Sequence, residues 1–142
     1  MKAKDVMTTQ VEGVLSEDTV QQAAIKMKEL DVGVLPVTSA GEVTGILTDR
    51  DIVVRSVAPG LDHSTQKVMD IATQDLVSCG EEDDIQVVAD LMEKNQIRRL
   101  LVKNEAGEVT GIVSLGDLAV QIQKEKTGEI LSRVSEPAHP QR

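Results

Sequence analysis

The sequence contains no phenylalanine, tyrosine or tryptophan among its 142 residues. Proteins that bind single-stranded nucleic acids stack the bases on aromatic side chains, and this chain offers none. Positive charge is also scarce, because 24 Asp and Glu residues outnumber 15 Lys and Arg residues and give a formal net charge of −9. Such a charge repels a polyanion. The composition therefore argues against nucleic acid as a partner.

Cysteine occurs once, as Cys79, so no disulfide can form within the chain, and a reducing cytoplasm is the expected compartment. No apolar run reaches the roughly 18 residues of a membrane-spanning helix, and Met1 to Asp5 turn polar too early for a signal peptide. His63, Cys79 and His139 are scattered without metal-ligand spacing, so no metal site is predicted. No nucleophile–base pair can be assembled either, and we expect a protein that is not an enzyme.

One stretch of sequence occurs twice. The seven residues AGEVTGI at positions 40–46 recur unchanged at positions 106–112. An exact match of this length indicates that one structural unit is built twice. Upstream of each match, apolar residues follow the i, i+3, i+4, i+7 spacing of an amphipathic helix. These residues are Val20, Ala23, Ala24 and Met27 in the first copy and Ile85, Val88, Ala89 and Met92 in the second.

Two apolar runs flank the glycine turn of each match, which predicts a β-hairpin, and the second run leads directly into another helix. We therefore predict an α/β (α+β) fold of two tandem β-α-β-β-α repeats related by pseudo-two-fold symmetry. The repeats cover residues 1–61 and 62–124, and residues 125–142 are expected to be a helix end and a flexible tail. Pro36 predicts an edge position or a strand end, because proline cannot donate to a ladder.

Polar residues at fixed spacing mark the start of each final helix. Both copies follow the pattern Gly-Ile-x-(Thr/Ser)-x-x-Asp, as residues 45–51 and 111–117. A helix N-terminus presents unpaired N–H groups that suit an anion. A carboxylate one turn into the helix can accept two hydrogen bonds from the cis-diol of a ribose. The same spacing is also that of a helix-capping box, and the residues alone leave both roles open.

The two motifs, in register and with matching upstream helices, resemble a pair of CBS domains. This family is named after cystathionine beta-synthase, and a pair is called a Bateman module. The resemblance extends from about Lys4 to Val120 and is closest to small stand-alone bacterial CBS-pair proteins. It implies a regulatory module that binds an adenosine-containing ligand in clefts between the repeats. AMP, ADP or ATP is expected first, and S-adenosylmethionine or NAD are alternatives. No other cofactor is required.

The resemblance also implies roles for individual residues. Thr48 and Ser114 would contact ribose or phosphate, and Asp51 and Asp117 would hold the ribose hydroxyls. Each of these residues could instead serve only as a helix cap.

Arg98 and Arg99 match a basic pair that grips phosphate in the regulatory subunit of AMP-activated kinase, whereas the first copy has Gly33 and Val34 there. The two arginines could instead be exposed strand residues or form salt bridges. Further candidates for ligand contact are Val34, Pro36, Leu101 and Arg50. The three apolar residues could equally be core residues, or they could sandwich an adenine.

The resemblance implies a homodimer formed through apolar helix faces near Ile52–Val54 and Leu118–Ile122. Any effector would be a protein on another chain. The alternative is a structural or protein-interaction module whose clefts are vestigial and bind no nucleotide.

Overall fold

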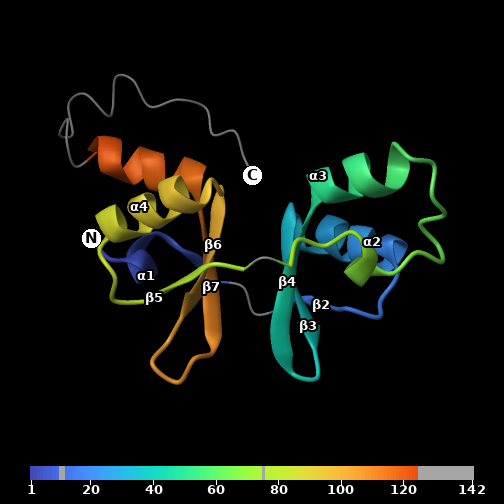
Figure 1. The fold of residues 1–142 in the computed structure, drawn as a ribbon, viewed down its shortest axis with the longest axis horizontal. Coiled ribbons are helices and arrows are strands. Elements are labelled where there is room, and N and C mark those ends of the chain that lie inside the picture. Colours follow the sequence, from blue (N-terminus) through green and yellow to red (C-terminus); the bar gives the residue numbers. More distant parts are fainter. Residues whose placement is uncertain (10–11, 75, 125–142) are drawn as a thin grey trace. The chain divides into compact units, whose positions relative to one another are not determined.

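The computed structural model describes residues 1–9, 12–74 and 76–124. The predicted helix end and tail at 125–142 lie outside these residues. The chain divides into two compact units, one of residues 10–76 and the other of residues 1–9 together with the chain from Val77 onward. We call them the first-copy unit and the second-copy unit, because each contains one of the two matching motifs (Figure 1).

The first-copy unit is a three-stranded sheet with helices on one face. Its elements are β2 (Val14–Leu15), α2 (Val20–Leu30), β3 (Val34–Ser39), β4 (Glu42–Thr48), α3 (Asp49–Ile52), the π-helical turn η1 (Val53–Val57) and the 3-10 turn η2 (Val68–Asp70). The strand order is β2-β3-β4, with β2 parallel and β4 antiparallel to β3. The core side chains are Val14, Val20, Ala23, Met27, Leu35, Val37, Leu47, Val68, Ile71 and Ala72. All of them come from within residues 10–76.

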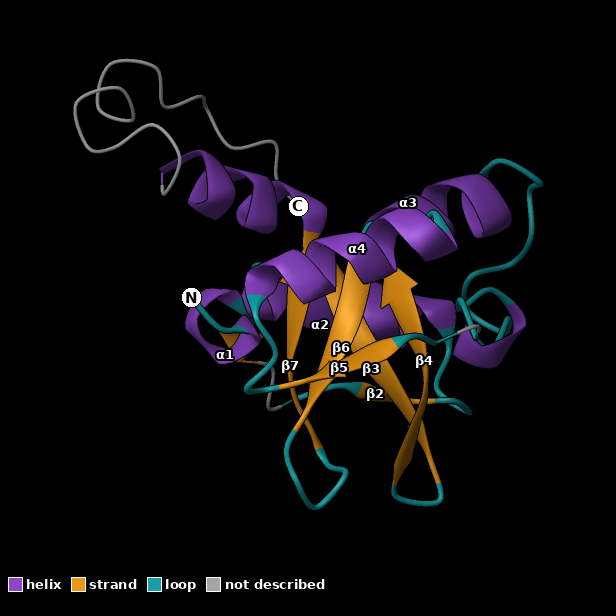
Figure 2. Ribbon diagram, turned by 60° about the vertical axis from the view of Figure 1, so that its left-hand side comes forward, coloured by secondary structure: helices purple, strands orange, loops and turns teal. Residues whose placement is uncertain are grey.

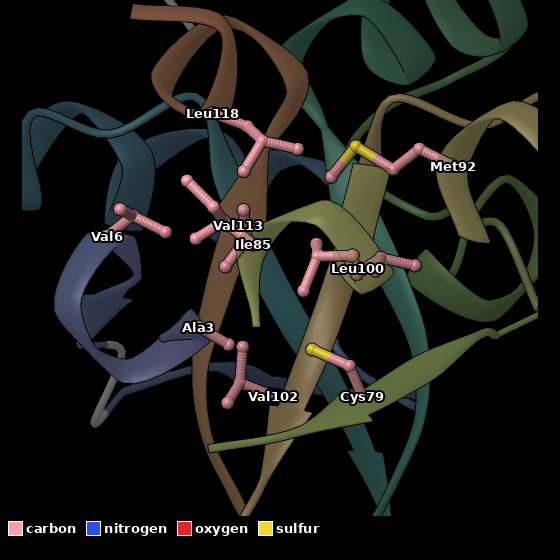
Figure 3. Close-up of a cluster of buried hydrophobic side chains, with 10 residues drawn as sticks. Ala3, Val6, Cys79, Ile85, Met92, Leu100, Val102, Val113 and Leu118 are labelled. Carbon is pink, nitrogen blue, oxygen red and sulfur yellow. The ribbon is translucent and has the colours of Figure 1, made fainter. Parts of the chain in front are cut away.

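The second-copy unit repeats this plan with one more strand. Its elements are α1 (Ala3–Val6), β1 (Thr8–Thr9), β5 (Ser78–Gly80), α4 (Ile85–Asn95), β6 (Arg99–Lys103) and β7 (Val109–Ser114), followed by a helix at residues 115–124. The strand order is β1-β7-β6-β5. Its core, which includes Leu100, Val113 and Leu118, also contains Ala3 and Val6 from the start of the chain (Figure 3).

Both predicted hairpins are confirmed, and each predicted amphipathic helix begins with a side-chain cap. Thr19 Oγ1 accepts a hydrogen bond from Gln22 N, and Gln22 Oε1 accepts one from Thr19 N, which is a complete capping box. Asp84 caps the equivalent helix by accepting from Gln86 N. The hairpins β3–β4 and β6–β7 form as expected, and each leads into a helix at the end opposite to its turn (Figure 2).

The prediction that Pro36 marks an edge or a strand end is wrong. Pro36 lies inside β3, the central strand of its sheet, and is in register with Ile46 of β4. On the other side, β2 pairs only with Val37 and Thr38. Pro36 therefore lies beyond the part of β3 that β2 covers, and no donation to β2 is lost.

The segments that precede the first helix of each copy pack in the opposite unit from the one that sequence order suggests. Residues 1–9 belong to the second-copy unit, where Ala3 N donates to Asp83 O at 2.8 Å and β1 pairs with β7. Residues 62–76, which include η2, complete the first-copy unit. There Val68 N donates to Asp18 O at 2.8 Å.

Surface charges hold the N-terminal segment in place as well. The ammonium groups of Lys2 and Lys4 lie 2.5 and 2.7 Å from the carboxylate of Glu82. Their hydrogen bonds lower the pKa of Glu82 to about 2. All three side chains are about half exposed or more, so each ion pair adds little to the free energy of unfolding. The segment is held mainly by backbone hydrogen bonds and by its buried apolar residues.

The motif glycine of the second copy allows this segment to approach β7. A methyl group on Gly111 would lie 2.5 Å from Met7 Sδ and 2.9 Å from the Thr8 carbonyl oxygen. Met7 could shift, but the carbonyl belongs to the backbone of β1. The glycine of the Gly-Ile motif is thus explained by close packing, with no ligand needed.

We expect Gly111→Ala to lower the free energy of unfolding by about 1–3 kcal/mol, because an added methyl group overpacks this contact. Thermal unfolding followed by circular dichroism should show a melting temperature lower by roughly 3–10 °C. Gly80→Ala is the control, since its methyl group would lie 3.7 Å from its nearest neighbour, an ordinary contact. Equal melting temperatures for the two variants would contradict this account.

In the described part of the chain, no helix has both the length and the apolar character needed to cross a membrane.

Candidate functional site

Three of the predicted site residues share one face of the second-copy sheet. Arg99 is in register with Ser114, and Leu101 with Ile112. Side chains alternate between the faces of a strand, so Arg99 and Leu101 lie on the face opposite to Leu100 and Val102, which point into the core. Arg99 and Ser114 are therefore direct cross-strand neighbours on the face opposite to the core cluster that contains Leu100 and Val102.

The first-copy sheet has the same geometry with different side chains. Val34 is in register with Thr48, and Pro36 with Ile46, while Leu35 and Leu47 point into the core. Val34 therefore takes the place of Arg99. The structure brings together Val34, Pro36 and Thr48 in one unit and Arg99, Leu101 and Ser114 in the other. Only the second set carries a positive charge.

The first-copy motif forms a closed capping box. Asp51 N donates to Thr48 Oγ1 at 3.1 Å, and Thr48 N donates to Asp51 Oδ2 at 3.0 Å. The second carboxylate oxygen, Oδ1, lies 3.9 Å from Arg55 Nε. The Asp51 side chain is only 13 % exposed. In this copy the capping role of the motif, which the sequence left open, is realised.

The second-copy motif is capped from one side only. Asp117 N donates to Ser114 Oγ at 3.1 Å. The Asp117 side chain is exposed, and within the described chain no hydrogen bond or ion pair reaches its carboxylate. Asp117 also borders a hollow of about 270 Å³ between α1 and the helix at residues 115–124. Its other lining residues are Asp5, Val6, Val120, Gln121 and Lys124.

The remaining two candidates lie apart from these groups. Arg50 is exposed on the first turn of α3. Arg98 is exposed just before β6, and its carbonyl accepts a hydrogen bond from Leu115 N at 2.8 Å. Gly33 O accepts equivalently from Asp49 N, which confirms that Gly33 and Arg98 occupy matching positions.

Arg55, which lies outside the motif, contacts the first-copy motif acid. Besides its approach to Asp51, Arg55 Nη1 donates to the carbonyl oxygen of Ile71 at 3.2 Å. Its position four residues after Asp51 on a helix is the spacing of a side-chain ion pair and could have indicated it.

Cys79 is a buried residue of β5. Burial raises the pKa of its thiol to about 11, so the thiol stays protonated and unreactive at neutral pH. Among the described residues, no group of three or more His, Cys, Asp or Glu side chains could hold a metal ion.

Comparison with known proteins establishes the family. Residues 3–57 and 68–124 each match the CBS domain. The chain is 42 % identical over 133 residues to the CBS domain-containing protein YhcV of Bacillus subtilis, which covers 93 % of this chain and 94 % of that protein. The chain belongs to the CBS domain family and carries a tandem pair of these domains, as the resemblance implied.

Solved structures support the same fold. Hypoxic Response Protein I, solved with two coordinated zinc ions, is 34 % identical with a TM-score of 0.69, over 85 % of this chain and 98 % of that one. The CBS domain pair of protein MJ0100 was solved in complex with 5′-methylthioadenosine and S-adenosylmethionine. It has a TM-score of 0.74 over 88 % of this chain and 98 % of that one, and its identity of 22 % supports the fold alone.

Proposed function

We propose that this protein is a regulatory sensor for small molecules that contain adenosine. The observation that carries the proposal is the arrangement in the second-copy unit, where Arg99 lies across from Ser114 and Asp117 stands exposed one turn into the following helix. A cation, a helix N-terminus and an unpaired carboxylate are the groups that recognise phosphate and ribose together.

Each group has a distinct chemical task. The guanidinium of Arg99 can donate two parallel hydrogen bonds to a phosphate. Ser114 stands at the N-terminus of a helix, where backbone N–H groups and the helix dipole favour an anion. Asp117 can accept hydrogen bonds from both ribose hydroxyls. Leu101 lies on the same sheet face as Arg99 but is only 1 % exposed, so we assign it no contact with the adenine.

Protein MJ0100, which has the same fold, was solved as a CBS domain pair with two adenosyl compounds, and we propose the same ligand class for this chain. Arg99 favours a phosphorylated member of the class, so we place AMP, ADP or ATP first. The predicted first-copy residues place no positive charge on the corresponding sheet face. They are Thr48, Asp51, Val34, Pro36 and Arg50, and Arg50 lies on α3 and not on the sheet. The proposal therefore rests on the second copy.

The test is a dye-based thermal-shift panel of AMP, ADP, ATP, S-adenosylmethionine and NAD. A ligand at about 100 times its dissociation constant stabilises the fold by roughly 2.7 kcal/mol, or about 5–10 °C for a chain of this size. We expect at least one selective shift, and we expect Asp117→Ala to abolish it. No hydrogen bond or ion pair reaches the Asp117 carboxylate in the described chain, so this variant should melt close to the temperature of the wild type without ligand.

A flat panel would argue for the alternative, an interaction module without a nucleotide ligand. The purified protein must show no absorbance at 260 nm, because a nucleotide retained through purification would already occupy the site and hide a shift.

We further propose that the protein acts as a homodimer in the cytoplasm and passes its signal to an effector protein on another chain. Val53, Val54 and Val57 are 57, 47 and 61 % exposed on the helix that follows β4, and together they form an apolar surface. Leu118 of the second copy is 1 % exposed and belongs to the core, so it is not available for such a contact. No catalytic or metal-dependent role is proposed.

A further inference from the structure

The helices that follow the two motifs differ at one decisive position. Counting from the motif acids, Arg55 stands four residues after Asp51, and Gln121 stands four residues after Asp117. Arg55 lies 3.9 Å from the Asp51 carboxylate and donates to the carbonyl oxygen of Ile71 at 3.2 Å. Its side chain therefore bridges the helix to the segment that contains η2.

The second copy is open at the corresponding place. There the helix at residues 115–124 faces α1, which is the counterpart of the η2 segment, because Val6 aligns with Val68. Gln121 and Asp117 line the hollow of about 270 Å³ between these two elements, together with Asp5 and Val6. The place that the Arg55 side chain fills in the first copy is therefore open in the second copy.

The two motif carboxylates consequently differ in their contacts and in their exposure to solvent. Asp51 Oδ2 accepts from Thr48 N, Oδ1 faces Arg55, and the side chain is 13 % exposed. A ribose would have to displace both partners and break the capping box. Asp117 is exposed, and the described chain provides no partner for its carboxylate. A ribose could bind there without breaking any contact.

We infer that each chain binds one adenosyl ligand, through the second copy, and that Arg55 closes the first copy by holding Asp51 as a structural cap. The inference rests on the proposed function and adds its stoichiometry and the residue that sets it. Arg55 and Gln121, rather than the shared motif, distinguish the closed copy from the open one.

The test is isothermal titration calorimetry with AMP and with S-adenosylmethionine on four proteins. These are the wild type and the variants Asp51→Asn, Asp117→Asn and Gln121→Arg. Asparagine at position 51 can still accept the hydrogen bond from Thr48 N, so the fold is kept. Gln121→Arg transfers the first-copy bridge to the second copy. Circular dichroism melts of all four proteins confirm that each is folded.

We expect one ligand per chain for the wild type and for Asp51→Asn, with dissociation constants within about twofold of each other. Asp117→Asn and Gln121→Arg should each weaken binding at least tenfold, by about 1.4 kcal/mol or more. Equal losses for Asp51→Asn and Asp117→Asn, two ligands per wild-type chain, or unchanged binding by Gln121→Arg would overturn the inference and leave the proposed function standing. A wild type that binds neither of these compounds nor any other compound of the thermal-shift panel would overturn both the inference and the proposed function.

Discussion

A chain that lacks residues 1–9 is expected to lose the packed structure of its second-copy unit while its first-copy unit stays folded. The deletion removes Ala3 and Val6, which are 0 and 8 % exposed, from the second-copy core. It also removes strand β1 and the hydrogen bond from Ile85 N to Met1 O at the start of α4. We expect a loss on the order of 3–5 kcal/mol, a large part of the stability of so small a unit.

Hydrogen exchange tests this prediction by measuring the protection of the amides in each strand. Amides of β6 and β7 should lose most of their protection, whereas amides of β3 and β4 should keep theirs. Glu82→Gln is the matched control, because it removes only the exposed ion pairs that contact the same segment and should leave the protection of both units nearly unchanged. Equal loss of protection in both units would show that the N-terminal segment does not belong to one of them.

Arg99→Gln is expected to weaken the binding of ligands that carry a phosphate and to leave the binding of ligands without one unchanged. Affinity for AMP should fall about 10- to 100-fold, because a hydrogen bond to a charged group contributes roughly 1.5–3 kcal/mol. Affinity for 5′-methylthioadenosine, which has no phosphate, should stay within about twofold. Both values can be measured by isothermal titration calorimetry.

Arg98→Gln is the control for the same charge change. Arg98 is exposed and precedes β6, so its loss should alter neither affinity by more than about twofold. If both variants weakened AMP binding equally, the effect would come from net charge, and the proposed contact between Arg99 and phosphate would be wrong.

The sequence predicted those parts of the fold that depend on local patterns. The two amphipathic helices and both hairpins depend only on neighbouring residues, and all are present. The pairing of Thr8 with Ile112 was not predicted, because two short segments far apart in the chain carry no periodic signal of their pairing. Pro36 was misplaced because its position depends on where β2 ends.

In the candidate site, too, the sequence predicts only what depends on local patterns. The repeat alignment places Arg99 and Ser114 on neighbouring strands of one hairpin, but their exact pairing depends on a register shift between Val102 and Lys103 that the sequence does not signal. The different states of Asp51 and Asp117 could not be predicted from the motif, because both copies have the same spacing. The difference arises from Arg55, whose hydrogen bond to Ile71 O depends on the path of a distant segment.

The placement of residues 1–9 in the second-copy unit has a consequence for synthesis. The described core residues of the first-copy unit all lie within residues 10–76, so this part can pack as soon as it has left the ribosome. The other unit needs both the first nine residues and the strand and helix that end the described chain. Residues 1–9 are translated before residues 10–76 and must therefore wait for the chain that follows residue 76, and the nascent chain carries Ala3 and Val6 uncovered until then.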